Sequence, residues 1–383
     1  MRGSVQNRGK NSWRLKFDAG RDAATGKRNI QYITFHGNKR EAQLKLAELI
    51  TAVGKDSYVK PSKTTVGEFV RVRIDQWEAA GDISARTAQR YRQLLKHQVA
   101  PHIGTKALQK LQPLDIEQWH TVLRSSGRVR GKGTLSARTL NHAHKLLGKA
   151  LADAAKNEMV NRNVARLKSP PKVTDTGDEM VIVRDVPAFV EKVRGSALYV
   201  PALLGILCGM RLGEVLALRW NRIDLDAKVI QVREALEQTS AHGIRFKPPK
   251  SRAGNRDISL PDNVVDALRE YRREQLELRM QLGAGKMPQD ALLFTDIDGN
   301  PRSLYAASAA WRSFAERIGM PEVTFHALRH SHASHLIDAG VDIVTISRRL
   351  GHASPDITLR VYSHLFRKDD SKAAAAINAV LNR

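Results

Sequence analysis

The chain of 383 residues contains a single cysteine, Cys208, so no intramolecular disulfide can form. The lack of disulfides fits a reducing compartment, and Cys208 is expected to be a small buried core residue. A long hydrophobic stretch is also missing. The longest uncharged, mostly apolar run, residues 197–210, has 14 residues, whereas a membrane-spanning helix needs about 20. No apolar signal segment opens the chain. We therefore expect a soluble cytoplasmic protein with no membrane partner.

Acidic side chains are few compared with basic ones. The sequence has 39 Asp and Glu against 63 Lys and Arg, a net charge of +24 and a pI near 10.3. Such an excess predicts a polyanionic partner, either nucleic acid or an anionic membrane surface. Residues 1–63 carry +9, residues 64–172 carry +12 and residues 173–383 only +3. Arginines in the nearly neutral C-terminal half are therefore expected to have specific roles.

Alternating apolar and basic residues predict strands near the N-terminus. Residues 13–17 and 29–35 alternate in this way, and residues 39–53 have helical spacing. We expect a small three-stranded sheet plus a helix, forming a domain over residues 1–60. A sheet with basic residues on its open face can lie in a DNA groove, although a solvated β-unit is the simpler alternative. The candidates for such DNA contacts are Arg14 and Lys16.

A helical domain is expected over residues 64–168, after a polar linker. The apolar spacing predicts a bundle of four or five helices, the last of them a long helix over residues 138–156. The side chains expected on the outside of this helix are His142, His144, Lys145 and Lys149. Exposed Lys and Arg suit contacts to DNA phosphates, and a solvated charged face is the alternative for any one of them. The candidates for DNA contacts in this domain are Arg128, Arg130, Lys132, Arg138, Lys145 and Lys149.

A Pro-Pro linker and the drop in net charge mark the start of a third domain, expected over residues 175–383. It is predicted to be helical with a strand-rich insertion. One hairpin is expected over residues 223–232, and a second pair of strands over residues 244–260. An Ala-rich helix over residues 371–381 can dock on its own body or on another subunit. The expected fold class is mainly α with small β elements, in three domains.

Six polar side chains in the third domain can act together on one phosphodiester. Arg211 lies three residues before Glu214, so the two share a helix face and can pair. A guanidinium held by a carboxylate is oriented for a bidentate grip on phosphate oxygens. His326 and Arg329 have the same spacing in the run His-Ala-Leu-Arg-His, on a helix expected to begin near Thr324. The six residues are Arg211, Lys250, His326, Arg329, His352 and Tyr362.

The last two of the six follow on separate short elements. Gly351 is expected to end one helix, which places His352 at a helix break. Pro355 is expected at the first position of the short helix that carries Tyr362.

A zinc site is an alternative use of the histidines. His326 and His330 have the i,i+4 spacing of some zinc helices. Ala327 replaces the glutamate of the pattern His-Glu-x-x-His, and the cation of Arg329 lies between the two ligands, which argues against metal binding. We expect no metal and no cofactor.

Four motifs follow one another in the third domain: Gly-Met-Arg-Leu-Gly-Glu, His-Ala-Leu-Arg-His, Leu-Gly-His and a tyrosine ten residues later. In this order they resemble the motifs of the tyrosine recombinase family, specifically the phage-type integrases. The likeness covers essentially the whole chain. It implies an arm-type DNA-binding domain over residues 1–60, a helical core-binding domain over residues 64–168, and a mixed α/β catalytic domain of the DNA breaking-rejoining type over residues 175–383. It implies that Tyr362 is the nucleophile and that Arg211 and Arg329 clamp the phosphate. The residues that would complete the pocket are His326, His352 and Lys250, the last on a mobile β-hairpin.

The chemistry of these groups agrees with that resemblance. A phenol with a pKa of about 10 is a poor nucleophile at neutral pH and needs a proton acceptor, for which His326 is the candidate. Lys250, or Lys247 on the same strand, can protonate the leaving 5′ oxygen. The product is a 3′-phosphotyrosine with a free 5′ hydroxyl. Bond energy is conserved, so ATP is not needed, and the cationic side chains can activate the phosphodiester without a metal. A second 5′ hydroxyl reverses the step and exchanges strands.

The function we expect is site-specific recombination of double-stranded DNA, in the integration and excision of a phage or other mobile element. The resemblance implies a homotetramer on core and arm sites in the nucleoid of a bacterial host, with a host DNA-bending protein and an excisionase as further partners. A recombinase that resolves chromosomes or plasmids usually lacks the arm-binding unit. A type IB topoisomerase shares the chemistry but needs no second site. A non-catalytic DNA-binding regulator would need neither the tyrosine nor the paired arginines.

Overall fold

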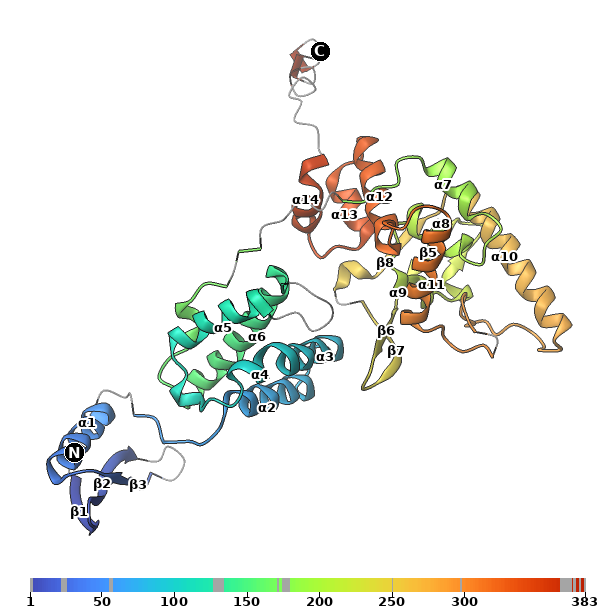
Figure 1. Ribbon diagram of the computed structural model, residues 1–383. Helices are drawn as coiled ribbons and strands as arrows, with labels where there is room; N and C mark the ends of the chain where they lie inside the picture. The colour runs from blue at the N-terminus through green and yellow to red at the C-terminus, as the bar shows by residue number, and fades with distance from the viewer. Residues whose placement is uncertain are drawn as a thin grey trace. The chain divides into compact units, whose positions relative to one another are not determined.

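The computed structural model in Figure 1 describes residues 3–21, 26–54, 58–126, 134–170, 172–173, 180–249, 251–296, 298–365, 374, 377–378 and 380–381. The chain divides into two compact units, residues 1–174 and 175–383. Helices predominate, and the strands of the described part form three small antiparallel sheets. The fold class expected from the sequence, mainly α with small β elements, is therefore confirmed.

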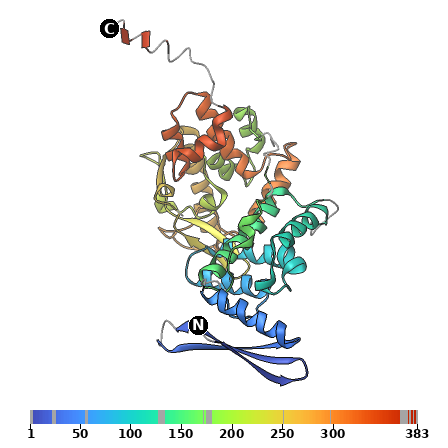
Figure 2. The same cartoon turned by 90° about the vertical axis from the view of Figure 1, so that its left-hand side faces the viewer.

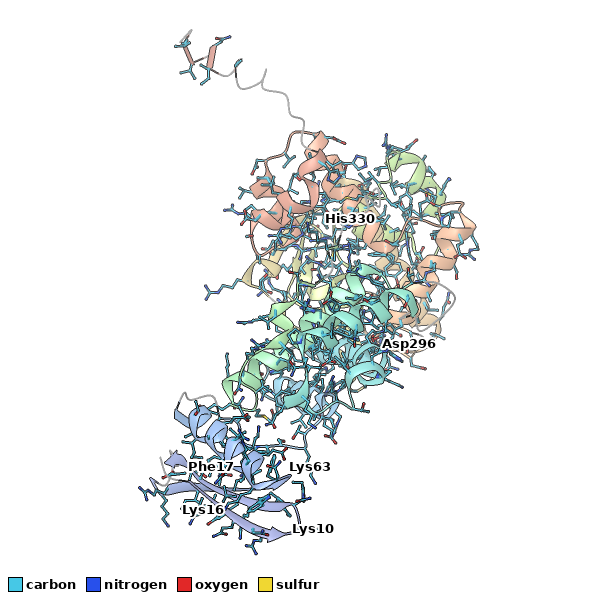
Figure 3. The ribbon with its side chains drawn as sticks, turned by 60° about the vertical axis from the view of Figure 1, so that its left-hand side comes forward. Lys10, Lys16, Phe17, Lys63, Asp296 and His330 are labelled. Atoms are coloured by element: carbon cyan, nitrogen blue, oxygen red, sulfur yellow. The ribbon has the colours of Figure 1, made fainter. Side chains whose placement is uncertain are left out.

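The N-terminal unit begins with a three-stranded sheet in the order β1-β2-β3. The elements are β1 (Gly3–Gly9), β2 (Ser12–Arg21), β3 (Arg28–His36) and α1 (Lys39–Gly54). Because side chains alternate along a strand, Leu15 and Phe17 point to one face, where they are buried with Ala42 and Leu46 of α1. Figures 1 and 2 show α1 lying along the sheet. The opposite face carries Lys16, which neighbours Phe17 on β2 in Figure 3.

A helical bundle makes up the rest of the N-terminal unit. Its helices are α2 (Val66–Ala79), α3 (Ala85–Leu94), a π-helical turn η1 (Leu95–Val99), α4 (Ala100–Ile103), a 3-10 turn η2 (Leu108–Lys110), α5 (Pro113–Ser126), α6 (Ala137–Lys156) and a second 3-10 turn η3 (Val164–Leu167). Leu and Ala positions of α6 form the centre of its core. Asp153 joins α6 to α2 by accepting hydrogen bonds from Trp77 Nε1 at 2.8 Å and Arg73 Nε at 3.0 Å.

The C-terminal unit is built around α8, whose residues 200–206 are all buried. Its helices are α7 (Val186–Val193), α8 (Tyr199–Ile206), α9 (Leu212–Leu216), α10 (Asp262–Gln281), α11 (Leu304–Arg317), α12 (Phe325–Asp338), α13 (Ile343–Leu350) and α14 (Pro355–Tyr362). Its 3-10 turns are η4 (Trp220–Arg222), η5 (Arg252–Gly254) and η6 (Ser363–Leu365). Helices α8, α9 and α12 share one apolar core with the strands.

The strands of this unit form two sheets and correct one sequence prediction. They are β4 (Ile223–Asp224), β5 (Val229–Val232), β6 (Ala235–Thr239), β7 (Gly243–Lys247) and β8 (Arg256–Ser259). The β4–β5 hairpin agrees with the prediction. The second predicted pair is wrong, because β7 pairs with β6 and β8 pairs with β5. Strand β6 was not predicted because its central residue, Glu237, is a carboxylate and interrupts the apolar pattern. In the structure Glu237 is buried and forms ion pairs with Lys247 and Arg245 of β7.

Two further expectations concern single side chains. Cys208 is fully buried, and this burial raises the pKa of its thiol to about 12, so the prediction of a core residue is confirmed. His144 was expected on the outside of α6 but is buried, with Nδ1 3.0 Å from His120 Nε2 of α5. That prediction is wrong because a histidine partner on the neighbouring helix satisfies the imidazole inside the core. The predicted C-terminal helix over residues 371–381 lies largely outside the described residues.

Candidate active site

The candidate site begins at the turn between α8 and α9. Gly209 has φ +66°, and a Cβ placed there would meet His332 Cδ2 at 2.6 Å, so glycine is needed for this turn. The turn leads to Arg211, which stands at the N-cap of α9. Glu214 accepts hydrogen bonds from Arg211 N at 2.9 Å and from Arg211 Nη1 at 2.8 Å. The predicted Arg-Glu pair therefore exists, and it fixes the direction of the guanidinium.

Arg329 lies on α12 with a side chain that is only 2% exposed. Thr324 caps this helix by accepting a hydrogen bond from Ala327 N at 3.1 Å, which places His326 and Arg329 on its first turns. The guanidinium donates through Nη1 to Gly209 O at 2.7 Å and through Nη2 to Leu350 O at 2.5 Å. Two loops from distant parts of the unit are thus tied to one arginine.

Tyr362 is the last residue of α14 and is 1% exposed. Its hydroxyl lies 2.8 Å from His330 Nδ1, a hydrogen bond between the two side chains. His330 stands in turn against His326, with ring centroids 4.5 Å apart and the rings almost perpendicular. Figure 3 labels His330 among the helices of the C-terminal unit. Sequence reasoning considered His330 only as a metal ligand, and its contact with the tyrosine is new.

His352 sits at the break between α13 and α14, as expected. Gly351 takes a left-handed conformation with φ +67°, and His352 N donates to Ser347 O at 3.0 Å, which closes α13 with a Schellman-type cap. The imidazole Nδ1 lies 2.7 Å from Thr358 Oγ1 on α14. The side chain is therefore held between the end of one helix and the start of the next.

The charges of the site are unbalanced in favour of cations. Burial, and then the charge of the nearby Arg211, lower the pKa of Arg329 to about 9. Burial raises the pKa of Tyr362 to about 12, against the opposite effect of Arg329 and Arg211. Burial, then the same two arginines, lowers the pKa of His352 to about 4 and also lowers that of His326. The mutual influence of these groups shows that five of the six predicted residues come together, with neutral histidines around two guanidinium groups.

Lys250, the sixth predicted residue, lies outside the described residues. Lys247, the alternative to it, is paired with the buried carboxylate of Glu237 on β6. Burial would raise the pKa of Glu237, but the hydrogen bond and charge of Lys247 outweigh it and keep the pKa low.

Arg256 is a second residue that sequence reasoning missed. It stands at the start of β8, is 7% exposed, and contacts Glu214 through Nη1 at 3.1 Å and Nη2 at 2.8 Å. Burial would raise the pKa of Glu214, but Arg256 and then Arg211 hold it at about 2. The signal that could have found Arg256 is the buried carboxylate of Glu214, which has room for more hydrogen-bond donors than Arg211 alone supplies.

The candidate DNA contacts on the N-terminal sheet share one face. Arg14 lies over the ring of Tyr32 at 4.3 Å from its centroid, and Lys16 Nζ lies 5.9 Å from the same centroid. Tyr32 is 49% exposed. These contacts hold two cations and one aromatic side chain on the open face of the sheet, opposite α1.

The candidate contacts on the helical bundle fall into two groups. Arg138 and Lys145 are exposed on α6, and their charges, with that of Arg90 on α3, act on His142 between them. Lys149 is half-buried, with Nζ 4.2 Å from the centroid of the Trp77 ring, so it covers an indole. The three candidates from the loop before α6 lie outside the described residues: Arg128, Arg130 and Lys132.

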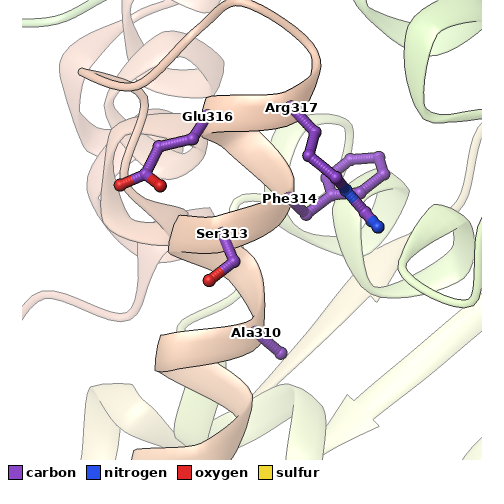
Figure 4. A pocket seen from close by; sticks show the side chains of 5 residues that line it. All are labelled: Ala310, Ser313, Phe314, Glu316 and Arg317. Carbon is purple, nitrogen blue, oxygen red and sulfur yellow. The ribbon is translucent and has the colours of Figure 1, made fainter.

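The described part also has a pocket that lies away from these residues. A shallow pocket on α11 is lined by side chains that include Ser313, Glu316 and Arg317, and it contains none of the residues above (Figure 4). Within the described ranges, no group of three or more His, Cys, Asp or Glu side chains is placed to hold a metal ion. No helix within those ranges is long and apolar enough to cross a bilayer.

Comparison with known proteins places this architecture in a family. Residues 186–369 match the phage integrase family, and residues 73–123 match the N-terminal SAM-like domain of phage integrases. A tyrosine recombinase XerC-like protein of Caldanaerobacter subterraneus subsp. tengcongensis is 24% identical over 390 residues, covering 97% of this chain and 96% of that protein. An integrase of Streptomyces ambofaciens is 27% identical over 355 residues, covering 90% and 88%.

A solved structure has the same fold. The Tn1549 transposon integrase, solved with a circular intermediate DNA, superposes with a TM-score of 0.67 at 18% identity and covers 83% of this chain and 99% of that one. The fold and the sequence matches together define an enzyme that recombines DNA at specific sites. The chain belongs to the phage integrase family of tyrosine recombinases.

Proposed function

We propose that this recombinase cuts DNA by direct attack of Tyr362 on a phosphodiester. The Tyr362 oxygen bonds to phosphorus, the bond from phosphorus to the 5′ oxygen breaks, and a 3′-phosphotyrosine and a 5′ hydroxyl result. Arg211 and Arg329 bind the two non-bridging oxygens. Loss of one such donor raises a barrier of this kind by about 2.7–4 kcal/mol. The observation that carries the proposal is that the buried Tyr362 lies within the electrostatic influence of two guanidinium groups, those of the buried Arg329 and the half-buried Arg211.

His330 is the acceptor that we assign to the phenol proton. Its Nδ1 lies 2.8 Å from the Tyr362 hydroxyl, within the reach required of a general base. Burial, and then the charges of His326 and Arg329, lower the pKa of His330 to about 4, so the ring is neutral and able to accept a proton at neutral pH. His326, which sequence reasoning named as acceptor, then faces the phosphate together with His352, each as a neutral donor.

Lys250 is our candidate for the proton that the leaving 5′ oxygen needs. Lys247 is committed to its ion pair with Glu237, and a cation held by a buried carboxylate is a poorer donor to a substrate oxygen. The preference for Lys250 is therefore one of elimination between two lysines that the sequence left open. The reaction conserves the number of phosphodiester bonds, so it needs no ATP, and the arginines supply the charge that a metal would otherwise provide.

The DNA is gripped, we propose, by the basic N-terminal residues. The face of Arg14, Lys16 and Tyr32 is suited to an arm site, and the α3–α6 surface around Arg138 and Lys145 to the phosphates of a core site. On this reading residues 1–60 are an arm-binding domain, residues 64–168 a core-binding domain and residues 175–383 the catalytic domain.

Exchange between two duplexes requires four strand cleavages, which favours a homotetramer on two sites. Integration by such an assembly, and its reversal in excision, would take place on the nucleoid of a bacterial cell. A host DNA-bending protein and an excisionase are the further partners that we expect in these two directions.

Recombination between two core-site duplexes tests the proposal. Wild-type protein should exchange strands in the presence of EDTA and without ATP, and Tyr362→Phe should bind the same DNA but exchange none. A strict requirement for Mg²⁺, or strand exchange by Tyr362→Phe, would contradict the mechanism. Relaxation of a supercoiled plasmid that carries a single site, without any requirement for a second site, would favour a topoisomerase instead.

A further inference from the structure

Arg256 is buried beside the site but is not free to bind DNA. Its Nε donates to Arg349 O at 2.7 Å, its Nη1 to Gly254 O at 3.3 Å, and both Nη groups to Glu214. These bonds use four of the five N–H groups of the guanidinium. With 7% of the residue exposed, Arg256 has no surface to offer a phosphate. Its role must therefore be carried out through the groups that it contacts.

Glu214 is the group that Arg256 shares with the site. Each carboxylate oxygen accepts one bond from Arg256 and one from Arg211: Oε1 from Nη1 of both arginines, and Oε2 from Arg256 Nη2 and Arg211 N. The carboxylate thus lies between a cation that is buried and a cation whose side chain is 39% exposed. Four donors saturate its acceptor sites and fix its plane.

The charges of this trio decide what Arg211 can offer a substrate. With Glu214 alone, the positive charge of Arg211 would be cancelled locally by the carboxylate that orients it. With Arg256 present, the trio keeps a net charge of +1, and the exposed guanidinium carries it. Electrostatic interactions inside a partly buried site are stronger than in water, so this one charge matters to the phosphate.

We propose that Arg256 is a positioning residue that balances the charge of Glu214, so that Glu214 can orient Arg211 without neutralising it. The bond from Arg256 to Arg349 O adds a second effect, because it anchors the last turn of α13, which leads to Gly351 and His352. The α13 carbonyl end is the negative pole of that helix and suits a buried cation. The proposal rests on the role of Arg211 in the proposed function.

A double-variant cycle tests the charge balance directly. The assay measures the rate at which full-length protein forms a covalent adduct with a nicked core-site DNA under single-turnover conditions. The nick lets the short strand that carries the free 5′ hydroxyl dissociate after cleavage, so the adduct accumulates. Arg256→Gln leaves the trio with no net charge, and we expect cleavage about a hundredfold slower, comparable to the loss of one transition-state donor. Glu214→Gln combined with Arg256→Gln restores the net charge of +1, so this double variant should cleave at least tenfold faster than Arg256→Gln alone.

Controls separate this role from a merely structural one. Arg256→Lys keeps the charge, so it should retain cleavage within about tenfold of wild type. Arg219→Gln removes an arginine of the same unit that is paired with Glu234 at 2.6 Å, and it should leave cleavage unchanged. A DNA linkage with a neutral methylphosphonate at the cleaved position offers less charge to Arg211, so on it the deficit of Arg256→Gln should shrink at least tenfold.

The outcomes are distinct. A double variant no faster than Arg256→Gln, a folded Arg256→Lys as slow as Arg256→Gln, or an equal deficit on both DNA linkages would overturn the charge-balance role. If Arg256→Gln cleaved at the same rate as the wild-type protein, any role of Arg256 in cleavage would be overturned. Failure of the wild-type protein to form an adduct through Tyr362 would instead refute the proposed function on which the inference rests.

Discussion

Replacing His330 with alanine removes the acceptor that lies 2.8 Å from the Tyr362 hydroxyl. Because the pKa of Tyr362 is raised to about 12, only about one phenol in 10⁵ is ionised at pH 7 without help. A general base typically contributes a factor of about 10²–10⁴, which corresponds to roughly 3–5 kcal/mol of barrier. We therefore expect His330→Ala to slow adduct formation by two to four orders of magnitude at pH 7.

The pH dependence distinguishes this role from a general loss of structure. In the wild-type protein the acceptor is neutral above its pKa of about 4, so the cleavage rate should be nearly flat from pH 6 to 9 and should fall only in acid. Without the acceptor, cleavage depends on the ionised phenol, and the rate of His330→Ala should rise about tenfold per pH unit over the same range. Single-turnover adduct formation on a nicked core site measures both profiles.

His326→Ala is the matched control for this prediction. His326 lies against His330 on the same helix, whereas the Tyr362 hydroxyl forms its hydrogen bond with His330, so the loss of His326 should slow cleavage while leaving the profile flat. A flat profile for His330→Ala, or a rising profile for His326→Ala, would refute the assignment and return the role of base to His326. His330→Ala should also lower the free energy of unfolding by about 1–3 kcal/mol, since a buried hydroxyl loses its partner.

The remaining predictions concern stability, metal and domains. Arg329→Lys should lower the free energy of unfolding by about 2–4 kcal/mol in chemical denaturation, because an ammonium cannot reach both Gly209 O and Leu350 O; unchanged stability would contradict the tie between the two loops. The free energy of unfolding should fall as the pH drops from 6.5 towards 4, by up to about 1.4 kcal/mol per pH unit for each buried histidine. Burial and then the charge of His144 lower the folded-state pKa of His120 to about 4, so over this range the unfolded chain binds protons that the folded chain does not. A free energy of unfolding that stays constant over this range would refute that burial. Adduct formation should persist in EDTA, and its loss on chelation would refute a metal-free step. Deleting residues 1–60 should leave core-site cleavage intact and weaken integration into a full-length site pair, and undiminished integration would contradict the arm-binding role.

Much of the fold could be read from periodicity because most of its elements bury one face. The alternation around Leu15 and Phe17 gave the N-terminal sheet, and the helical spacing before Tyr362 gave α14. Strand β6 was missed because Glu237 interrupts its apolar pattern. The cations that stabilise the buried carboxylate of Glu237 come from β7, and periodicity does not reveal that these two strands pair. His144 was misplaced for the same kind of reason, because His120 supplies its partner from another helix.

The candidate site divides in a similar way. The motifs around Arg211 and Arg329 identified the groups that we propose to act on a phosphate, because their chemistry and spacing are local. Arg256 and His330 were missed because their roles depend on contacts across the fold, from β8 to α9 and from α12 to α14. Sequence spacing can show which side chains share a helix face, whereas the choice of proton acceptor among neighbouring histidines is decided by a distance in space.

The central claim is that Tyr362 becomes covalently linked to DNA. The direct measurement is mass spectrometry of the protein trapped on a nicked core site and then digested with protease and nuclease. The peptide containing Tyr362 should carry a nucleotide attached through its 3′ phosphate, and this adduct should be absent from Tyr362→Phe. An adduct on any other residue, an attachment through a 5′ phosphate, or an adduct formed by Tyr362→Phe would contradict the account.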